Sequence, residues 1–325
     1  MTDFLAYSSP SGKKVLAKGI WKETTFSLLK ENHFFVTDFL KEKTFYFEKE
    51  DKLNDISEID NFEIPSTKES LFTISMEEYL QQLNNFIEGF SKNEIKKAVF
   101  SRISEIENDI ALSTLFSRLE EKYGNKALIY IVSSDNFGTW IGATPEILLE
   151  GNTTEIRSMS LAGTKAKEGI QWTSKEEEEQ QIVTDFIADK ITKYEPTHFS
   201  QSEPYTFYSG AVYHLRSDFS FQLPKQNWLP LIKELHPTPA VCGIPTKKAV
   251  KHILSFEKHE RKFYTGLIGF ITANELQVYV NLRCMEKTAN GFALYLGGGI
   301  TDASDPQDEW NETENKAKTL LSIFD

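Results

Sequence analysis

The sequence contains little cysteine, no long hydrophobic run and no excess of positive charge. Only two of its 325 residues are cysteine, Cys242 and Cys284, and both have apolar neighbours. A disulfide framework is therefore not expected, and buried free thiols are typical of a reducing cytoplasm. No apolar stretch approaches the roughly 18 residues that a membrane-spanning helix needs, and the first residues lack the pattern of a signal peptide. We therefore expect a cytoplasmic protein that does not interact with a membrane.

The charge balance excludes another class of partner. The chain carries 48 acidic and 36 basic residues, a formal net charge of −12. A nucleic-acid partner is not expected, because no basic field is present to displace counterions from a phosphate backbone. If the substrate is an anion, a few placed cations or a metal ion must attract it. The sequence also lacks a Walker loop, a strand–GxGxxG–helix unit, a nucleophile elbow and any Cys/His cluster with zinc spacing.

Apolar material, by contrast, is plentiful. Hydrophobic residues make up 40% of the chain and include 24 Phe and 12 Tyr, which suffices for a large core. Residues 1–70 have the pattern of strands and loops. Predicted helices then cover 75–90, 111–123, 173–187, 246–256 and a last stretch from 305, and predicted strands cover 96–103, 127–133, 137–141, 212–220, 263–270, 276–285 and 292–296. With no linker or internal repeat, this order predicts a single α+β domain over residues 1–325, with mixed, mostly antiparallel sheets and helices packed outside.

The most informative stretch is a glycine run followed by an acidic helix. Gly297, Gly298 and Gly299 follow an apolar run and predict a strand that ends in a tight turn with exposed amides. The capping residue and proline at 305–306 predict the start of a helix. On that helix Glu309, Glu312 and Lys316 share one face, which could hold a divalent cation and an anion. A solvated surface face has the same spacing, and spacing alone leaves both interpretations open.

Other polar residues stand in apolar surroundings. Lys97 lies near the start of a predicted strand, and Arg283 is a cation on an otherwise apolar one, where it needs a carboxylate from the protein or from a ligand. Glu146 is either an edge carboxylate in water or a partly desolvated acid whose raised pKa lets it donate a proton. His214 is either a satisfied core histidine or part of a site. Together with the acidic helices, these residues predict a site that binds Mg²⁺ and a small carboxylate-bearing molecule and performs acid–base chemistry.

Taken in chain order, these segments resemble a known family, the chorismate-utilising enzymes, which comprise isochorismate, salicylate, anthranilate and aminodeoxychorismate synthases. The resemblance extends from Lys96 to Phe324. Its segments are KAVFSR, GATPEILLE, SLAGT, SKEEEEQQIV, HPTPAVCGIP, FYTGLIGF, VNLRCME and LGGGITDASDPQDEWNETENK. One such segment would be weak support, but eight in the same order are strong. The resemblance implies that the substrate is chorismate and that the cofactor is Mg²⁺.

The resemblance also implies roles for individual residues. Lys97 matches the lysine that activates water for attack on the chorismate ring, and Glu146 matches the acid that protonates the departing 4-hydroxyl group. Glu179 and Glu312 match the two glutamates that hold Mg²⁺, which in turn binds the ring carboxylate. Glu309 is a nearby candidate that would act through water.

The remaining matches form the substrate site. Arg283 and Tyr264 match the pair that binds the enolpyruvyl carboxylate, and Lys316 matches the lysine that balances the ring carboxylate. Gly297 and its neighbours match a turn whose amides face a substrate carboxylate. Positions that line the pocket are matched by Gly163, Thr164, His214 and Ala240.

Within the family, the resemblance favours an isochorismate synthase. Anthranilate synthases carry glutamine in place of Lys97, aminodeoxychorismate synthases carry a nucleophilic lysine in place of Ala162, and salicylate synthases tend to carry threonine in place of Ala240. A salicylate synthase is the alternative, and a non-catalytic binding protein on the same scaffold is a rival from another class. The resemblance leaves open whether isochorismate would enter menaquinone, siderophore or salicylate synthesis.

The chain departs from the family at a few points. Gln180 stands where the family usually has histidine, and four consecutive glutamates make Glu176 the alternative to Glu179 as a metal ligand. Residues 1–70 are a divergent N-terminal part, and residues 96–325 carry the motifs. We expect no fused glutaminase segment, and a monomer or weak homodimer.

Overall fold

The computed structural model describes residues 2–29, 31–67, 71–165, 169, 171–209 and 212–324. The strands are β1 (Asp3–Ser8), β2 (Lys14–Thr24), β3 (His33–Thr37), β4 (Thr44–Lys52), β5 (Lys97–Glu107), β6 (Leu128–Ser134), β7 (Gly138–Thr144), β8 (Ile147–Asn152), β9 (Ile156–Lys165), β10 (Thr197–Gln201), β11 (Tyr205–Ser209), β12 (Val212–Gln222), β13 (Gly243–Ile244), β14 (Leu267–Ile271), β15 (Glu275–Val280), β16 (Cys284–Lys287) and β17 (Gly291–Ile300). The α-helices are α1 (Met76–Asn93), α2 (Leu112–Tyr123), α3 (Ser174–Thr192), α4 (Trp228–Leu235), α5 (Thr246–Phe256) and α6 (Pro306–Leu321), and short 3₁₀ helices cover Phe26–Leu28, Ile56–Asn61 and Lys225–Asn227.

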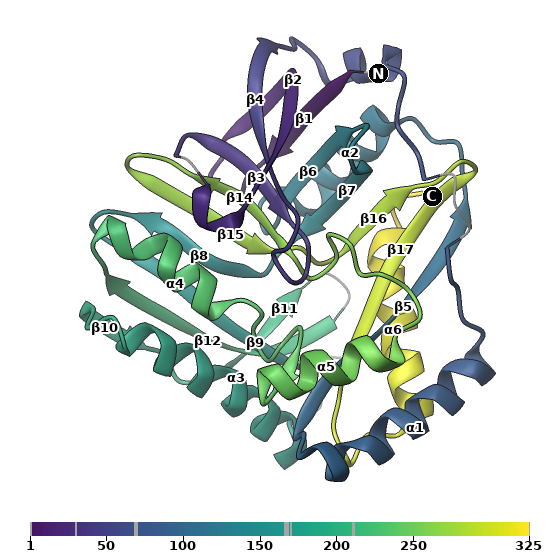
Figure 1. Cartoon of the computed structure of the whole chain (residues 1–325), viewed down its shortest axis with the longest axis vertical. Helices are drawn as coiled ribbons and strands as arrows, with labels where there is room; N and C mark the ends of the chain where they lie inside the picture. Colours follow the sequence, from purple (N-terminus) through teal and green to yellow (C-terminus); the bar gives the residue numbers. More distant parts are fainter. Residues whose placement is uncertain are drawn as a thin grey trace.

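The strands pair in one continuous antiparallel order. It runs β13-β5-β17-β16-β7-β6-β1-β2-β4-β3-β14-β15-β8-β9-β12, with β10 and β11 both on the far side of β12. The sheet folds back on itself: β5 and β17 form one arm, β9 and β12 form another, and β1–β4 lie between the arms along the pairing order (Figure 1). This arrangement confirms the predicted α+β fold with a mostly antiparallel sheet.

One core cluster lies within the folded sheet and three others lie beneath helices. The inner cluster is rich in aromatic side chains such as Trp21, Phe34, Trp140 and Tyr295. The outer clusters are covered by α3 and α4, by α2 and α6, and by α1 and α5. Helices outside the sheet are therefore confirmed as well. Within the described ranges, no helix is both long and apolar enough to cross a membrane.

Local sequence explains where the helices begin. Ser75 caps α1, and its capping box with Glu78 is formed as predicted. Buried residues on α1 recur at helical spacing, at Tyr79, Leu83, Phe86 and Phe90. Asp305 caps α6 through two backbone N–H groups, with proline in the first turn. The observed starts of α1, α3, α5 and α6 therefore agree with the sequence prediction.

Two segments differ clearly from the predicted strands. The predicted strand over 276–285 is broken between β15 and β16, where Arg283 adopts a left-handed backbone conformation with φ 47°. Its two halves pair with different strands, β15 with β14 and β8, and β16 with β17 and β7. The segment from 236 to 245, for which no helix or strand was predicted, contributes β13, which pairs with Lys97 and Ala98.

The glycine run is not a turn. β17 continues through Gly297, Gly298 and Gly299 to Ile300 and stays paired with β5, down to the pair of Ile300 with Ala98. The helix α6 follows after a short loop. The prediction of a strand is therefore confirmed, whereas the prediction that the glycines turn the chain is wrong.

Candidate active site

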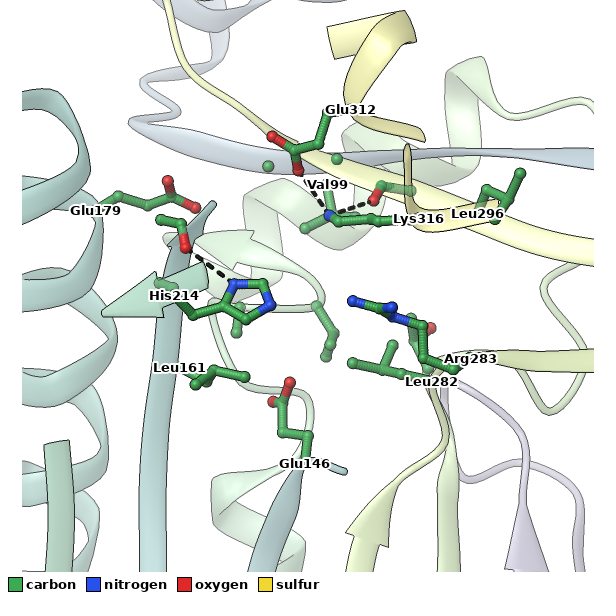
Figure 2. Close-up of a pocket in the computed structure, with 18 of the residues that line it drawn as sticks. Val99, Glu146, Leu161, Glu179, His214, Leu282, Arg283, Leu296, Glu312 and Lys316 are labelled. Atoms are coloured by element: carbon green, nitrogen blue, oxygen red, sulfur yellow. Dashed lines mark hydrogen bonds and ion pairs between the residues drawn. The ribbon is translucent and has the colours of Figure 1, made fainter. Parts of the chain in front are cut away.

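Residues that are far apart in the sequence line one pocket between the two arms (Figure 2). The predicted site residues on its wall are Lys97, Glu146, Gly163, Glu179, His214, Ala240, Tyr264, Arg283, Gly297, Glu309, Glu312 and Lys316. Thr164 follows Gly163 in β9, but its side chain lies outside what the structure describes. The sequence therefore identified residues that the fold brings together.

Lys97 is the first residue of β5, and its side chain is only 1% exposed. Its Nζ donates a hydrogen bond of 2.7 Å to Oε1 of Glu179 on α3. This contact joins the two arms across the pocket. Glu179 rather than Glu176 makes it, because the Glu176 carboxylate accepts hydrogen bonds from Thr173 at the start of α3 and lies 3.6 Å from Nζ of Lys165.

Glu146 lies between β7 and β8. In the pairing order β7 is close to β17, and β8 is next to β9, so the chain passes here from one arm to the other. Its side chain is buried, with the residue 6% exposed, so it is not an edge carboxylate in water. Burial raises the pKa of Glu146 to about 7, although the positive charges of Lys97 and Lys316 act in the opposite direction. In Figure 2 this carboxyl group approaches the pocket from the wall opposite Glu312 and Lys316. Near neutral pH a substantial fraction of Glu146 carries a proton.

The acidic face of α6 lies against the pocket and is only partly exposed to solvent. Nζ of Lys316 donates to Oε1 of Glu312 at 2.6 Å and to the carbonyl oxygen of Gly297 at 2.9 Å. Glu309 is 5% exposed. Because N–H and C=O of one strand residue point to the same edge, the Gly297 N–H also faces the edge that Lys316 approaches.

The glycine run allows carboxylates to approach the main chain closely. A Cβ atom at Gly298 would lie 3.0 Å from Oε2 of Glu309 and 3.9 Å from Oε1 of Glu312. A Cβ atom at Gly299 would lie 2.8 Å from Oε1 of Glu179. Glycine is needed here for space rather than for a left-handed backbone conformation.

These carboxylates fit a Mg²⁺ site in donor chemistry. Three carboxylate oxygens from two helices lie against consecutive glycines, and hard oxygen donors are what Mg²⁺ prefers. In the described parts of the chain, no three His, Cys, Asp or Glu side chains already surround a common point. Mg²⁺ does not require such a cage, because it commonly keeps several waters and binds one or two carboxylates together with the substrate.

His214 on β12 is neutral. Its Nδ1 lies 3.0 Å from the carbonyl oxygen of Gly163, which can only accept, so Nδ1 carries the proton and Nε2 is the acceptor. Burial, together with the nearby positive charges of Arg283 and Lys316, lowers the pKa of His214 to about 3. His214 therefore offers the pocket a hydrogen-bond acceptor and not a positive charge.

Arg283 and Tyr264 both lie in irregular segments. Arg283 lies between β15 and β16, and Tyr264 lies between α5 and β14. Tyr264 is 5% exposed, and its hydroxyl oxygen would lie 2.7 Å from a Cβ atom at Gly297. Arg283 points into the pocket from the side opposite His214 (Figure 2). With Lys97 and Lys316, Arg283 gives the pocket three cationic side chains in a protein of net charge −12.

Sequence reasoning missed the apolar residues that line the pocket, and it did not predict what Gln180 contacts. Val99, Leu161, Leu282 and Leu296 line the wall between the charged groups. The only sequence signal for these four residues was the alternation of apolar and polar residues along the strands. Gln180, which replaces the family's histidine, does not line the pocket; its amide donates to Oγ of Ser160 on β9 at 2.8 Å.

The N-terminal part also supports the pocket. Nζ of Lys41, in the turn between β3 and β4, lies 3.1 Å from Nδ1 of His236 and also donates to the carbonyl oxygen of His236. Nε2 of His236 lies 2.8 Å from the carbonyl oxygen of Thr265. His236 begins the loop that carries Ala240 to the pocket, so Lys41 holds this loop.

Comparisons with known proteins agree with this geometry. A family model described as chorismate binding enzyme matches residues 24–325. The chain is 31% identical over 264 residues to the vibriobactin-specific isochorismate synthase of Vibrio cholerae serotype O1, over 76% of this chain and 67% of that protein. It is 32% identical over 197 residues to the isochorismate synthase DhbC of Bacillus subtilis, over 56% of this chain and 50% of that protein. These matches span from half to about two thirds of the relatives' length.

A solved structure gives the same assignment of fold. MenF, the menaquinone-specific isochorismate synthase from Escherichia coli, matches with a TM-score of 0.80 at 18% identity, over 99% of this chain and 89% of that chain. At this identity the likeness shows a shared fold, and a fold by itself does not define a reaction. Membership is shown by the family model, which matches nearly all of the sequence. This chain belongs to the chorismate-binding enzyme family.

Proposed function

We propose that this protein is an isochorismate synthase, which converts chorismate to isochorismate. Water adds to one ring carbon while the 4-hydroxyl group leaves as water, so the atoms balance. The observation that carries the proposal is the pairing of a buried, protonatable Glu146 with Lys97 in one pocket. The names of the two relatives, both isochorismate synthases, support the choice of reaction.

Glu146 is proposed as the general acid. An acid works best when its pKa lies near the working pH, and burial raises the pKa of Glu146 to about 7. It gives its proton to the departing hydroxyl group and becomes a carboxylate. The nearby charges of Lys97 and Lys316 stabilise that carboxylate once it forms.

Lys97 is proposed as the general base that takes a proton from the attacking water. It takes this proton as a neutral amine, and its Nζ lies 2.7 Å from Oε1 of Glu179. After turnover, Lys97 holds the extra proton and Glu146 lacks one, and solvent exchange restores both.

Mg²⁺ is proposed as the cofactor. Glu179 and Glu312 would hold it, with Glu309 contributing through water. When bound, Mg²⁺ supplies positive charge that binds the ring carboxylate of chorismate.

The chain's own cations complete the recognition of the two carboxylates. Arg283 and Tyr264 would bind the enolpyruvyl carboxylate, since a guanidinium and a phenol can both donate to it. Lys316 and the N–H of Gly297 would face the ring carboxylate. Gly163, His214 and Ala240 are proposed to shape the pocket around the ring, and for Thr164 the same role is implied only by the resemblance to the family.

Incubation of the protein with chorismate and Mg²⁺, followed by chromatography of the products, tests the proposal. Accumulation of isochorismate is the expected result. Formation of salicylate and pyruvate would instead identify the alternative, a salicylate synthase. Unchanged chorismate would overturn both enzyme assignments and favour a binding protein. A cytoplasmic location and a monomeric or weakly dimeric state stay predictions.

A further inference from the structure

A buried arginine outside the predicted site uses all of its donors. Arg261 lies between α5 and β14, and its side chain is 3% exposed. It forms two hydrogen bonds to the carboxylate of Glu257, at 2.8 and 2.7 Å. Its other donors bind the carbonyl oxygens of Val241 and Val99, each at 2.9 Å, and Oγ1 of Thr265 at 3.4 Å. Every N–H of the guanidinium therefore has an acceptor.

The Arg261–Glu257 pair takes the place of a strand beside β5. One edge of β5 pairs with β17 along its length, but the other edge pairs only with the short β13. The Val99 N–H still reaches the carbonyl oxygen of Cys242, at 2.8 Å. Beyond it, the Val99 carbonyl oxygen accepts from Arg261, and the Ser101 N–H donates to Glu257 at 2.8 Å. Without this pair, two buried backbone groups of β5 would lose their partners.

The same pair connects three walls of the pocket. Val99 lies two residues after Lys97 on β5, and Val241 follows Ala240 in the proline-rich loop. The third wall is Tyr264, whose N–H donates to the Arg261 carbonyl oxygen at 2.8 Å. Each wall carries a residue assigned to catalysis or to substrate binding.

We propose that Arg261, held by Glu257, is a positioning residue that sets Lys97 relative to the loop at Ala240 and to Tyr264. This inference rests on the proposed function. Arg261 does not line the pocket and takes no part in proton transfer. Arginine is required because its planar fork binds both carboxylate oxygens and two separate carbonyl oxygens at once, whereas the ammonium of lysine donates from a single point. Glu257 is required because an unpaired buried guanidinium would be strongly unfavourable.

The decisive variant is Arg261→Lys, compared with Leu115→Ala as a control. Leu115 is a fully buried residue of α2 that lines no part of the pocket, so its truncation destabilises the protein without moving the site. Both variants are assayed at a temperature at which circular dichroism shows them folded. We expect kcat of Arg261→Lys to fall by about 10²-fold, the effect of displacing a catalytic group by about 1 Å, and kcat of the control to stay near that of the unchanged protein.

Hydrogen exchange provides a readout that does not depend on activity. In Arg261→Lys the amide of Ser101 is expected to exchange faster, because Glu257 loses the partner that holds it, while amides of β6 keep their protection. If Arg261→Lys does not fold, Glu257→Gln replaces it in both experiments, because this variant keeps the shape of the side chain and removes its charge. We expect Glu257→Gln to lose kcat as well, by a smaller factor.

The outcomes separate the two proposals. A folded Arg261→Lys variant with unchanged kcat and unchanged exchange at Ser101 overturns the positioning role. A loss of kcat equal to that of the control at matched thermal stability also overturns it. If the unchanged protein makes no isochorismate, the proposed function fails, and the exchange experiment alone then decides whether Arg261 holds β5.

Discussion

Two glutamates on opposite walls of the pocket illustrate how the same side chain can serve different purposes. Glu146 lies between two buried strands and is 6% exposed, and burial raises its pKa to about 7. Glu312 lies on a helix and accepts a hydrogen bond of 2.6 Å from Lys316. The first carboxyl group can keep a proton at neutral pH, whereas the second is in direct contact with an ammonium group.

These different surroundings, and not the residue type, are the reason for proposing Glu146 as the acid and Glu312 as a metal ligand. Desolvation without a direct cationic contact favours the neutral form of a carboxyl group, and a hydrogen-bonded lysine favours the charged form. The experiments that follow remove Glu146 or Glu312, or change the protonation of Glu146.

The largest effect is expected from Glu146→Gln, which removes the proton donor and keeps its shape. Turnover should fall by about 10²- to 10⁴-fold, the usual contribution of a general acid. Chorismate binding, measured by titration, should be nearly unchanged, because the carboxylate-binding cations remain. Glu177→Gln, at an exposed glutamate in the first turn of α3, is the control and should keep full activity. Loss of chorismate binding in Glu146→Gln would mean that Glu146 is structural.

On the other wall, Glu312→Ala removes a carboxylate assigned to Mg²⁺. Loss of a partner that only orients a ligand typically costs 10- to 100-fold in metal affinity, so loss of a ligand should raise the required Mg²⁺ concentration by about 100-fold or more. Activity is measured over a series of Mg²⁺ concentrations, and binding of Mn²⁺ as a substitute is titrated separately. Asp308→Ala, at an exposed position on the same helix, should behave like the unchanged protein. An unaltered Mg²⁺ dependence in Glu312→Ala would rule out the ligand role.

The contrast also predicts a pH dependence. Glu146 acts in its protonated form, so the ratio of kcat/KM of the unchanged protein to that of Glu146→Gln, in which Lys97 is common to both, should decline about tenfold per pH unit above about 7. The other groups facing Glu146 are Lys97 and Lys316, which lower its pKa, and His214, which is neutral in this range. A profile of kcat/KM from about pH 6 to about pH 9 measures the decline. A ratio that stays constant across this range would contradict an acid with this pKa.

The smallest effect concerns stability. A carboxyl group whose pKa is raised on folding stabilises the folded state fully below its ordinary pKa of 4.5, and this contribution is lost as pH rises through about 7. Glu146→Gln has no such loss, so it should be more stable than the unchanged protein at alkaline pH, by up to about 3 kcal/mol. Unfolding by urea at about pH 5 and about pH 8.5 gives the free energies of unfolding. An advantage for the variant that does not grow with pH would argue against a buried Glu146 charge.

Much of the site could be predicted from the sequence because its residues stand in short local motifs. The capping residues of α1 and α6 and the helical spacing of Glu309, Glu312 and Lys316 depend only on neighbours in the chain. The fold then had to bring the motifs together, and it did so for every described site residue.

The errors came from features that depend on distant strands. Whether the chain breaks at Arg283 is decided by β7 and β8, which pair with β16 and β15 respectively. The glycine run was predicted to be a turn because the sequence does not show why glycine is needed there. The need arises from the close approach of the Glu179 and Glu309 carboxylates, which belong to α3 and α6. Arg261 and Glu257 stand in a polar segment that resembles a solvated surface, and only the assembled fold buries them.

The pairing of β5 with β17 has a consequence for synthesis of the protein. Ala98 finds its partner in Ile300, about 200 residues later in the chain, and a ribosome adds about 5 to 20 residues per second. For about 10 to 40 seconds after its synthesis, the edge of β5 that pairs with β17 therefore has no partner strand. During this interval the nascent chain exposes an apolar strand that favours wrong pairings, and a chaperone that covers it would raise the yield of active enzyme.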